Sequence, residues 1–192
     1  MRRRHFIAIL LSSFLGLGGA AGSAIAQVSQ ATTVIVVRHA EKAALKTDNP
    51  PLSDAGRARA EALAHALEGA GVTAIITTQF IRTGETAART AQIAGVKPEI
   101  VPARWDSVPA HAAAVAAAVR RHAGGVVLVV GHSNTVPDIV AALGGERPDA
   151  ICDSEYDRFE VVTLSAEGSA RVIETRYGAP TPSGDACRSM KR

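Results

Sequence analysis

The sequence has 192 residues, of which 47% are hydrophobic and 20% are charged, and this length allows one compact domain with its own core. The net charge of +3 comes from three arginines at positions 2–4, because the first 26 residues contain no acidic residue. The pI of about 9.2 therefore gives no support for nucleic-acid binding, and any positive potential on the rest of the chain must be local.

Residues 1–26 have the pattern of a secretory signal peptide. Residues 2–4 are basic, residues 6–17 form an uncharged apolar stretch, and residues 24–26 are Ala-Ile-Ala, an A-x-A cleavage pattern. The apolar stretch is too short to span a bilayer, so we expect cleavage rather than a stable membrane anchor. The protein is then periplasmic or secreted. The Sec route is favoured over Tat, because the polar residue that usually precedes the paired arginines is missing.

Strands and helices alternate along residues 27–177, which we expect to form a single domain. In chain order the patterns predict a strand at 34–37, a helix from the N-cap Ser53 to near Gly69, a strand at 72–78, a helix at 82–95, an extended piece at 99–101, a helix from Ser107, a strand at 126–130, a helix capped by Thr135, and two strands at 158–165 and 170–176. This order predicts an α/β three-layer sandwich with a mostly parallel central sheet and a C-terminal β-hairpin at its edge.

Residues 178–192 are rich in Pro, Gly and Ser and are expected to form a C-terminal tail. The chain has two cysteines, Cys152 before the hairpin and Cys187 in this tail. In an exported protein they can form a disulfide that fixes the tail, or remain two small unpaired hydrophobic residues. Their spacing matches no common metal site.

Polar residues follow three of the predicted strands. Arg38 and His39 follow the first strand, Arg82 opens the helix after the second, and His132 follows the strand at 126–130. Ligands of open α/β sheets bind outside the carboxyl ends of the strands, so these residues predict an anion site. Two guanidinium groups match a phosphoryl dianion, and a neutral imidazole is a competent nucleophile. Acidic pairs at metal-ligand spacing are missing near these loops, so the chemistry requires no metal or other cofactor.

The other charged and titratable residues have simpler interpretations. Arg57 and Arg59 share the helix after Ser53 with two glutamates, and a solvated face is expected for all four. His5 lies in the signal segment. The remaining histidines sit in helical patterns and are expected to face solvent; they are His65, His111 and His122.

Four motifs in order resemble those of the histidine phosphatase (phosphoglycerate mutase-like) superfamily, particularly its small RHAEK…GHSNT type. They are RHA at 38–40, LSDAGRARA at 52–60, RTGETA at 82–87 and GHSNT at 131–135. The resemblance implies that His39 becomes phosphorylated and that Arg38, Arg82 and His132 bind the phosphoryl group. Thr78 stands where many relatives have a serine, and Asn134 is a further candidate phosphate contact.

The residue that protonates the leaving group is open. Glu41, two residues after His39, is the nearest acid in the sequence, and its other interpretation is an ion pair or a surface position. Asp106 is the alternative, because relatives often place their acid after the corresponding extended segment. Glu155 and Asp157, before the hairpin, are further candidates. Some small relatives manage without a clear acid.

The function that these features predict is an exported, metal-independent phosphatase that hydrolyses phosphomonoesters through a phosphohistidine on His39. Its partner is a small-molecule phosphate ester, with no role for nucleic acid. A non-catalytic phosphate-binding or regulatory module of the same fold is the alternative. A phosphomutase is a third interpretation, disfavoured because the chain has no obvious insertion that would cover the site.

Overall fold

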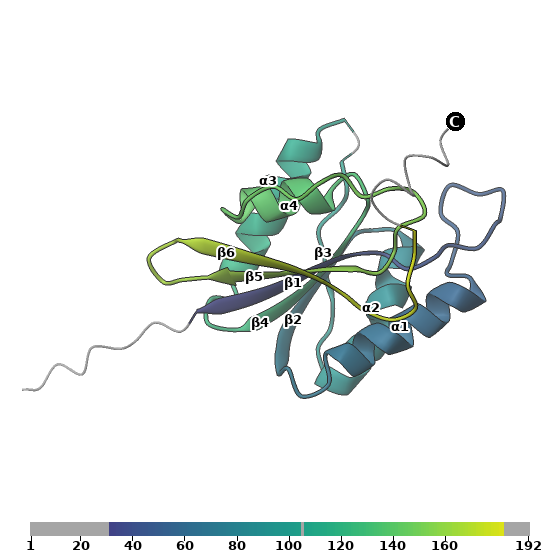
Figure 1. The fold of residues 1–192 in the computed structure, drawn as a ribbon, viewed down its shortest axis with the longest axis horizontal. Coiled ribbons are helices and arrows are strands. Elements are labelled where there is room, and N and C mark those ends of the chain that lie inside the picture. The colour runs from purple at the N-terminus through teal and green to yellow at the C-terminus, as the bar shows by residue number, and fades with distance from the viewer. Residues whose placement is uncertain (1–30, 105, 183–192) are drawn as a thin grey trace, which may run out of the picture.

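The computed structural model describes residues 31–104 and 106–182. The predicted signal peptide, with His5, and the predicted disulfide partner Cys187 lie outside the described residues. The elements, labelled in Figure 1, are β1 (Thr32–Arg38), α1 (Asp54–Ala66), β2 (Val72–Thr77), α2 (Ile81–Ala94), β3 (Glu99–Ile100), α3 (Val108–Arg120), β4 (Val126–Gly131), α4 (Val136–Ala142), β5 (Arg158–Leu164) and β6 (Ala170–Arg176). Within these ranges, no helix is long and apolar enough to cross a membrane.

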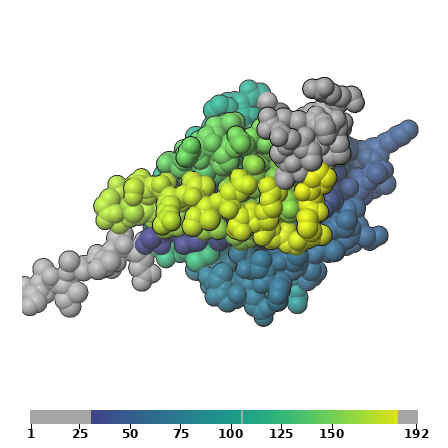
Figure 2. Space-filling model, in the orientation of Figure 1, coloured from purple at the N-terminus to yellow at the C-terminus, as the bar shows by residue number. Residues whose placement is uncertain are grey.

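The predicted α/β fold with a C-terminal hairpin is confirmed. One six-stranded sheet has the order β3-β2-β4-β1-β5-β6. The strands β3, β2, β4 and β1 run parallel, whereas β5 pairs antiparallel with β1 and with β6. Figure 2 shows the hairpin of β5 and β6 lying across one side of the molecule, between the α1 region and the α3–α4 region. The first four strands therefore bring their carboxyl ends to one edge of the sheet.

Helices α3 and α4 cover one face of the sheet, and α1 and α2 cover the other (Figure 1). The continuous β-branched run of β1 follows from this arrangement. Val34 and Val36 pack into the core beside α3 and α4, while Ile35 and Val37 pack into the core beside α1 and α2. All four are almost completely buried, and each contributes about 1.5–3 kcal/mol from burial. This central strand is the rigid support of the residues that follow it.

The predicted helix starts at Ser53 and Ser107 are confirmed, because each hydroxyl accepts a backbone hydrogen bond in the first turn of its helix. Thr135 differs. It occupies the N-cap position of α4, but its hydroxyl bonds the backbone of His132 instead of capping the helix. Gly56 in α1 approaches the segment after β1 so closely that a Cβ there would lie 2.1 Å from the carbonyl oxygen of Glu41. Helix α1 is thus packed directly onto the segment that follows His39.

Two expectations about exposure are wrong. Arg59 is only 4% exposed, although Arg57 on the same helix is exposed as expected. His111 is 1% exposed, and its Nδ1 lies 3.0 Å from the carbonyl oxygen of Pro102. Helical periodicity alone cannot tell which polar residue of a helix finds a partner inside the fold. By contrast, the side chain of His65 is 86% exposed, in agreement with the prediction.

Candidate active site

The two candidate histidines lie side by side at the carboxyl ends of β1 and β4. These strands are parallel neighbours with Arg38 opposite Gly131, and the His39 N–H donates to the carbonyl of Gly131 at 2.9 Å. The rings of His39 and His132 are edge to face, with centroids 5.3 Å apart. Both side chains are buried. The sheet thus brings together two residues that are 93 positions apart in the sequence.

The His39 imidazole is neutral and carries its proton on Nδ1. Nδ1 lies 2.8 Å from the carbonyl oxygen of Ala40, which can only accept a hydrogen bond, so Nδ1 is the donor. Burial and the positive charges of Arg38 and Arg82 lower the pKa of His39 to about 3, although the Ala40 bond acts in the opposite direction. The lone pair of the ring is therefore on Nε2, the nitrogen that can act as a nucleophile.

His132 is held by two threonines. Its Nε2 lies 3.1 Å from the hydroxyl of Thr78, which is itself 3.0 Å from the hydroxyl of Thr83. The hydroxyl of Thr135 accepts from the His132 N–H at 2.9 Å. Burial first, and then the adjacent His39 and Arg82, lower the pKa of His132 to about 2. The hydroxyl at position 78, noted where relatives have a serine, thus contacts the second histidine.

Arg38 is buried and held at one nitrogen. Its Nη1 donates to the carbonyl oxygens of Cys152 (2.7 Å), Asp153 (3.0 Å) and Glu155 (2.8 Å). Its guanidinium carbon lies 3.9 Å from the centroid of the Tyr156 ring. Its Nε is buried and has no hydrogen-bond partner among the described residues. Burial lowers the pKa of Arg38 from its ordinary value.

Arg82 shows the same combination from the first turn of α2. Its guanidinium carbon lies 4.3 Å from the centroid of the Phe80 ring, and its Nε is buried without a hydrogen-bond partner within the described ranges. Burial and the charge of Arg38 lower its pKa. An unsatisfied buried donor costs about 1–3 kcal/mol, and more when it is charged. Two such donors beside two neutral imidazoles make a site suited to an anion.

The first expected proton donor, Glu41, is bound to a buried arginine. Arg59 Nε donates to both carboxylate oxygens of Glu41 at 2.9 Å, and Arg59 Nη2 donates to one of them at 2.7 Å. The remaining nitrogen, Arg59 Nη1, donates to the carbonyl of Tyr177 at 3.2 Å. Both Glu41 oxygens are thus occupied as acceptors. These contacts support the ion-pair interpretation of Glu41 and give no support to proton donation.

The other candidate acids are also engaged elsewhere. Asp106 has a side chain that is 70% exposed and pairs with Arg104 at 3.1 Å, an interaction that lowers the Asp106 pKa. Glu155 is 1% exposed and lies 3.1 Å from Arg176, which also contacts Asp157 at 2.9 Å. No described contact joins any of these carboxylates to His39 or His132.

Asn134, the candidate phosphate contact, lies exposed in the turn between β4 and α4. Two aromatic residues were not identified from the sequence: Phe80 and Tyr156. The ring centroid of Phe80 lies 5.5 Å from that of His132, and the ring centroid of Tyr156 lies 6.3 Å from that of His39. Phe80 could have been found from its place two residues before Arg82, whereas Tyr156 has no such signal.

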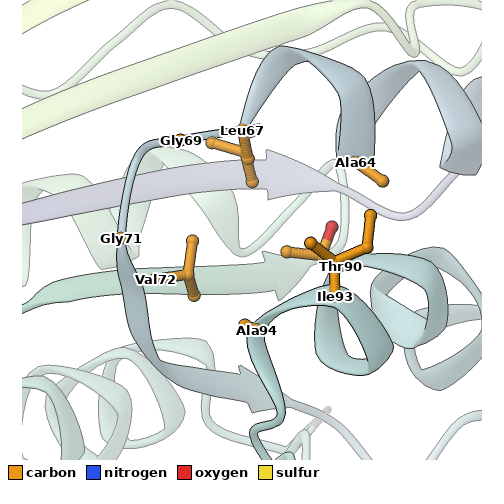
Figure 3. Close-up of a pocket in the computed structure, with 8 residues that line it drawn as sticks. All are labelled: Ala64, Leu67, Gly69, Gly71, Val72, Thr90, Ile93 and Ala94. Atoms are coloured by element: carbon orange, nitrogen blue, oxygen red, sulfur yellow. The ribbon is translucent and has the colours of Figure 1, made fainter.

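A cavity of about 320 Å³ lies away from these residues (Figure 3). It is formed near the end of α1, the start of β2 and the last turns of α2, by residues that include Leu67, Val72 and Ile93. This is the amino end of β2, whereas His39 and His132 follow the carboxyl ends of their strands. Its lining is mostly apolar and offers no charged group to an anion. Within the described ranges, no cluster of three or more His, Cys, Asp or Glu side chains could hold a metal ion.

The site of this α/β fold places two histidines and two arginines at the carboxyl ends of the parallel strands. A family model described as "Histidine phosphatase superfamily (branch 1)" matches residues 34–103. No curated protein matched the sequence. The chain thus resembles the histidine phosphatase superfamily over residues 34–103, the part of the sequence that contains the first three of its four motifs.

Solved structures share the fold. The protein histidine phosphatase SixA complexed with tungstate is 21% identical, with a TM-score of 0.61, over 75% of this chain and 96% of its own. A putative alpha-ribazole-5'-P phosphatase from Escherichia coli K-12 is 15% identical, with a TM-score of 0.59, over 78% and 99%. Phosphoglycerate mutase from Bacillus anthracis is 15% identical, with a TM-score of 0.56, over 77% and 93%. At these identities the likeness concerns the fold.

Proposed function

We propose that the protein is an exported, metal-independent phosphatase that hydrolyses phosphomonoesters through a phosphohistidine on His39. One observation carries this proposal. A neutral His39, with its lone pair on Nε2, lies in one site with Arg38 and Arg82, whose buried Nε donors have no partner among the described residues. A nucleophile and charged donors for a dianion are thus present together.

The first step is attack by His39 Nε2 on the phosphorus of the ester. The new N–P bond forms as the bond from phosphorus to the ester oxygen breaks, and the leaving oxygen takes its electron pair with it. Arg38 and Arg82 donate hydrogen bonds to the phosphoryl oxygens, whose charge is retained throughout. The Nδ1–H bond to Ala40 stabilises the positive charge that develops on the His39 ring.

The second step returns His39 to its starting state. Water attacks the phosphorus of phosphohistidine, the N–P bond breaks, and its electron pair returns to Nε2. The leaving oxygen takes one proton from solvent, the attacking water releases one proton as it becomes inorganic phosphate, and one water is therefore consumed for each ester hydrolysed. Thr78, through its contact with His132, holds the second imidazole beside the transferring group.

The leaving group receives little assistance from carboxylates. Glu41 is occupied by Arg59, and Asp106 is exposed and paired with Arg104. Without a positioned acid, departure of the leaving oxygen depends on its own basicity. We therefore propose that esters with good leaving groups, such as aryl phosphates, are the better substrates.

The alternative function is a phosphate-binding module without turnover, and His39→Ala separates the two. The wild type should release phosphate from an aryl phosphate in the presence of a chelator and should accumulate acid-labile phosphate, and His39→Ala should do neither. His65→Ala, at an exposed helical position, is the matched control and should retain both. If the wild type binds inorganic phosphate but releases none from the ester, the binding-module function is correct.

Export rests on residues 1–26 alone and has its own test. Expression of the full chain in a bacterial host should yield a periplasmic or secreted protein whose mass corresponds to a start at residue 27. A full-length protein that stays in the cytoplasm would contradict export without affecting the proposed chemistry.

A further inference from the structure

The segment from Cys152 to Asp157 is built around Arg38. Three carbonyl groups of this segment, those of Cys152, Asp153 and Glu155, accept hydrogen bonds from Arg38 Nη1, although it is 114 to 117 residues away in the sequence. A guanidinium group has five N–H donors in a fixed plane. In Arg38 the three carbonyl groups bind Nη1 only. The buried Nε lies on another edge of the guanidinium plane, where it has no partner among the described residues.

Tyr156 supports the face of the same guanidinium. Its ring centroid lies 3.9 Å from the guanidinium carbon of Arg38, which is a stacking distance. Contact through the face leaves the edges of the guanidinium available for hydrogen bonds. The ring also lies beside the nucleophile, with its centroid 6.3 Å from that of His39. One aromatic side chain thus contacts the arginine and neighbours the attacking imidazole.

The residues on both sides of Tyr156 have buried carboxylates that form ion pairs. Glu155 and Asp157 are 1% and 2% exposed, and Arg176 of β6 contacts both of them. The backbone N–H of Tyr156 donates to the hydroxyl of Thr181 at 3.0 Å. Thr181 belongs to the predicted C-terminal tail, so the described start of this tail is bound to the domain. The ring is therefore held in place independently of any ligand.

We propose that Tyr156 is a positioning residue that orients Arg38 toward the phosphoryl group. The proposal rests on the proposed function and adds a residue to its machinery. The aromatic face is the part of Tyr156 that acts, and its hydroxyl is not required. Phe80 beneath Arg82 has no hydroxyl, and this second stack shows that a plain ring suffices for the same arrangement.

The test compares Tyr156→Phe, which keeps the ring, with Tyr156→Leu, which removes it. We expect Tyr156→Leu to weaken inhibition by orthovanadate and to raise KM for an aryl phosphate, each by roughly fivefold to tenfold. Tyr156→Phe should stay within about twofold of the wild type on the same scale. If Tyr156→Leu does not fold, Tyr156→Met serves as the variant without a ring.

A matched control is Tyr177→Leu, because the Tyr177 ring is also stacked near a buried arginine, 5.8 Å from the guanidinium carbon of Arg59. It should lower the melting temperature and leave orthovanadate inhibition of the folded protein unchanged. Wild-type inhibition in Tyr156→Leu would overturn the proposal, and so would a Tyr156→Phe variant as impaired as Tyr156→Leu. If the wild type hydrolyses no ester, the proposed function fails, and calorimetric titration of the same variants with inorganic phosphate still decides the role of Tyr156.

Discussion

Replacing Glu41 by Gln separates the ion-pair role of this residue from proton donation. The Glu41 carboxylate accepts three hydrogen bonds from Arg59, whose side chain is 3% exposed. The substitution keeps the shape and one carbonyl acceptor and removes the charge. A structural ion pair predicts a loss of stability with little change in catalysis, whereas a proton donor predicts the reverse.

The size of the stability loss follows from the burial of the pair. Breaking a fully buried ion pair costs about 3–5 kcal/mol. Because the Glu41 side chain is 19% exposed and Gln retains one acceptor, we expect the free energy of unfolding to fall by about 2 kcal/mol. For a domain of this size that corresponds to a melting temperature lower by about 4–8 °C. Catalysis by the folded variant should change by less than about twofold, compared with the 10²–10⁴-fold loss of a general acid.

Thermal denaturation gives the stability change, and kcat/KM for an aryl and an alkyl phosphate gives the catalytic change. Both rates are measured well below the melting temperature of the variant. The reasoning is refuted if Glu41→Gln slows the alkyl ester by a hundredfold while sparing the aryl ester. Asp106→Asn is the control for the alternative acid, and its exposed position predicts no change in either measurement.

Three further predictions concern titration and hydrogen bonding. Because burial and nearby cations lower the pKa of His39 to about 3, kcat/KM should stay level from pH 7 to 5 after correction for substrate ionisation, whereas an imidazole with an ordinary pKa would lose roughly thirtyfold. Thr78→Val removes the hydroxyl that contacts His132 and should lower kcat by about tenfold, with Thr78→Ser restoring the rate. Burial, and then Glu174, raise the pKa of Glu160 to about 7, so the folded state binds its proton more tightly than the unfolded state and stability falls as pH rises from about 4 to 7. Glu160→Gln should therefore be more stable than the wild type at pH 8, by about 1–3 kcal/mol in denaturant unfolding, and should lose this advantage near pH 4; an equal effect at both values would contradict the assignment.

The residues that the sequence predicts well are those placed by the sheet itself. Arg38, His39 and His132 each follow a strongly apolar strand, and neighbouring parallel strands end at one edge, so their meeting follows from the strand pattern. The family resemblance, rather than the strand pattern, singled out Thr78, whose hydroxyl contacts His132 from the end of β2 on the other side of β4. For Arg38, His39 and His132, the pattern of apolar strands is therefore enough to predict that the side chains lie close together.

The roles of Glu41 and Tyr156 could not be predicted in this way. Glu41 pairs with a helical arginine because Gly56 lets α1 approach the Glu41 backbone, a packing contact that charge pattern does not encode. Tyr156 lies in a segment without helical or strand periodicity, and its contact with Arg38 depends on ion pairs made by its neighbours to Arg176. The sequence patterns thus predict the arrangement of strands and helices, but they do not predict long-range contacts between polar side chains.

The charges around His39 and His132 link anion binding at the site to proton uptake. The described residues place two arginine side chains beside two imidazoles, and burial first, then the neighbouring charges, lower the pKa of both imidazoles. The nearest candidate acid in the sequence, Glu41, has its oxygens bound to Arg59 rather than to these arginines. A phosphoryl dianion supplies the missing negative charge, and its arrival favours the protonated form of a nearby imidazole. In the proposed mechanism we therefore expect binding of phosphate to be coupled to uptake of a proton by the site, with Arg38 and Arg82 both lowering the pKa of His39 and binding the phosphoryl group.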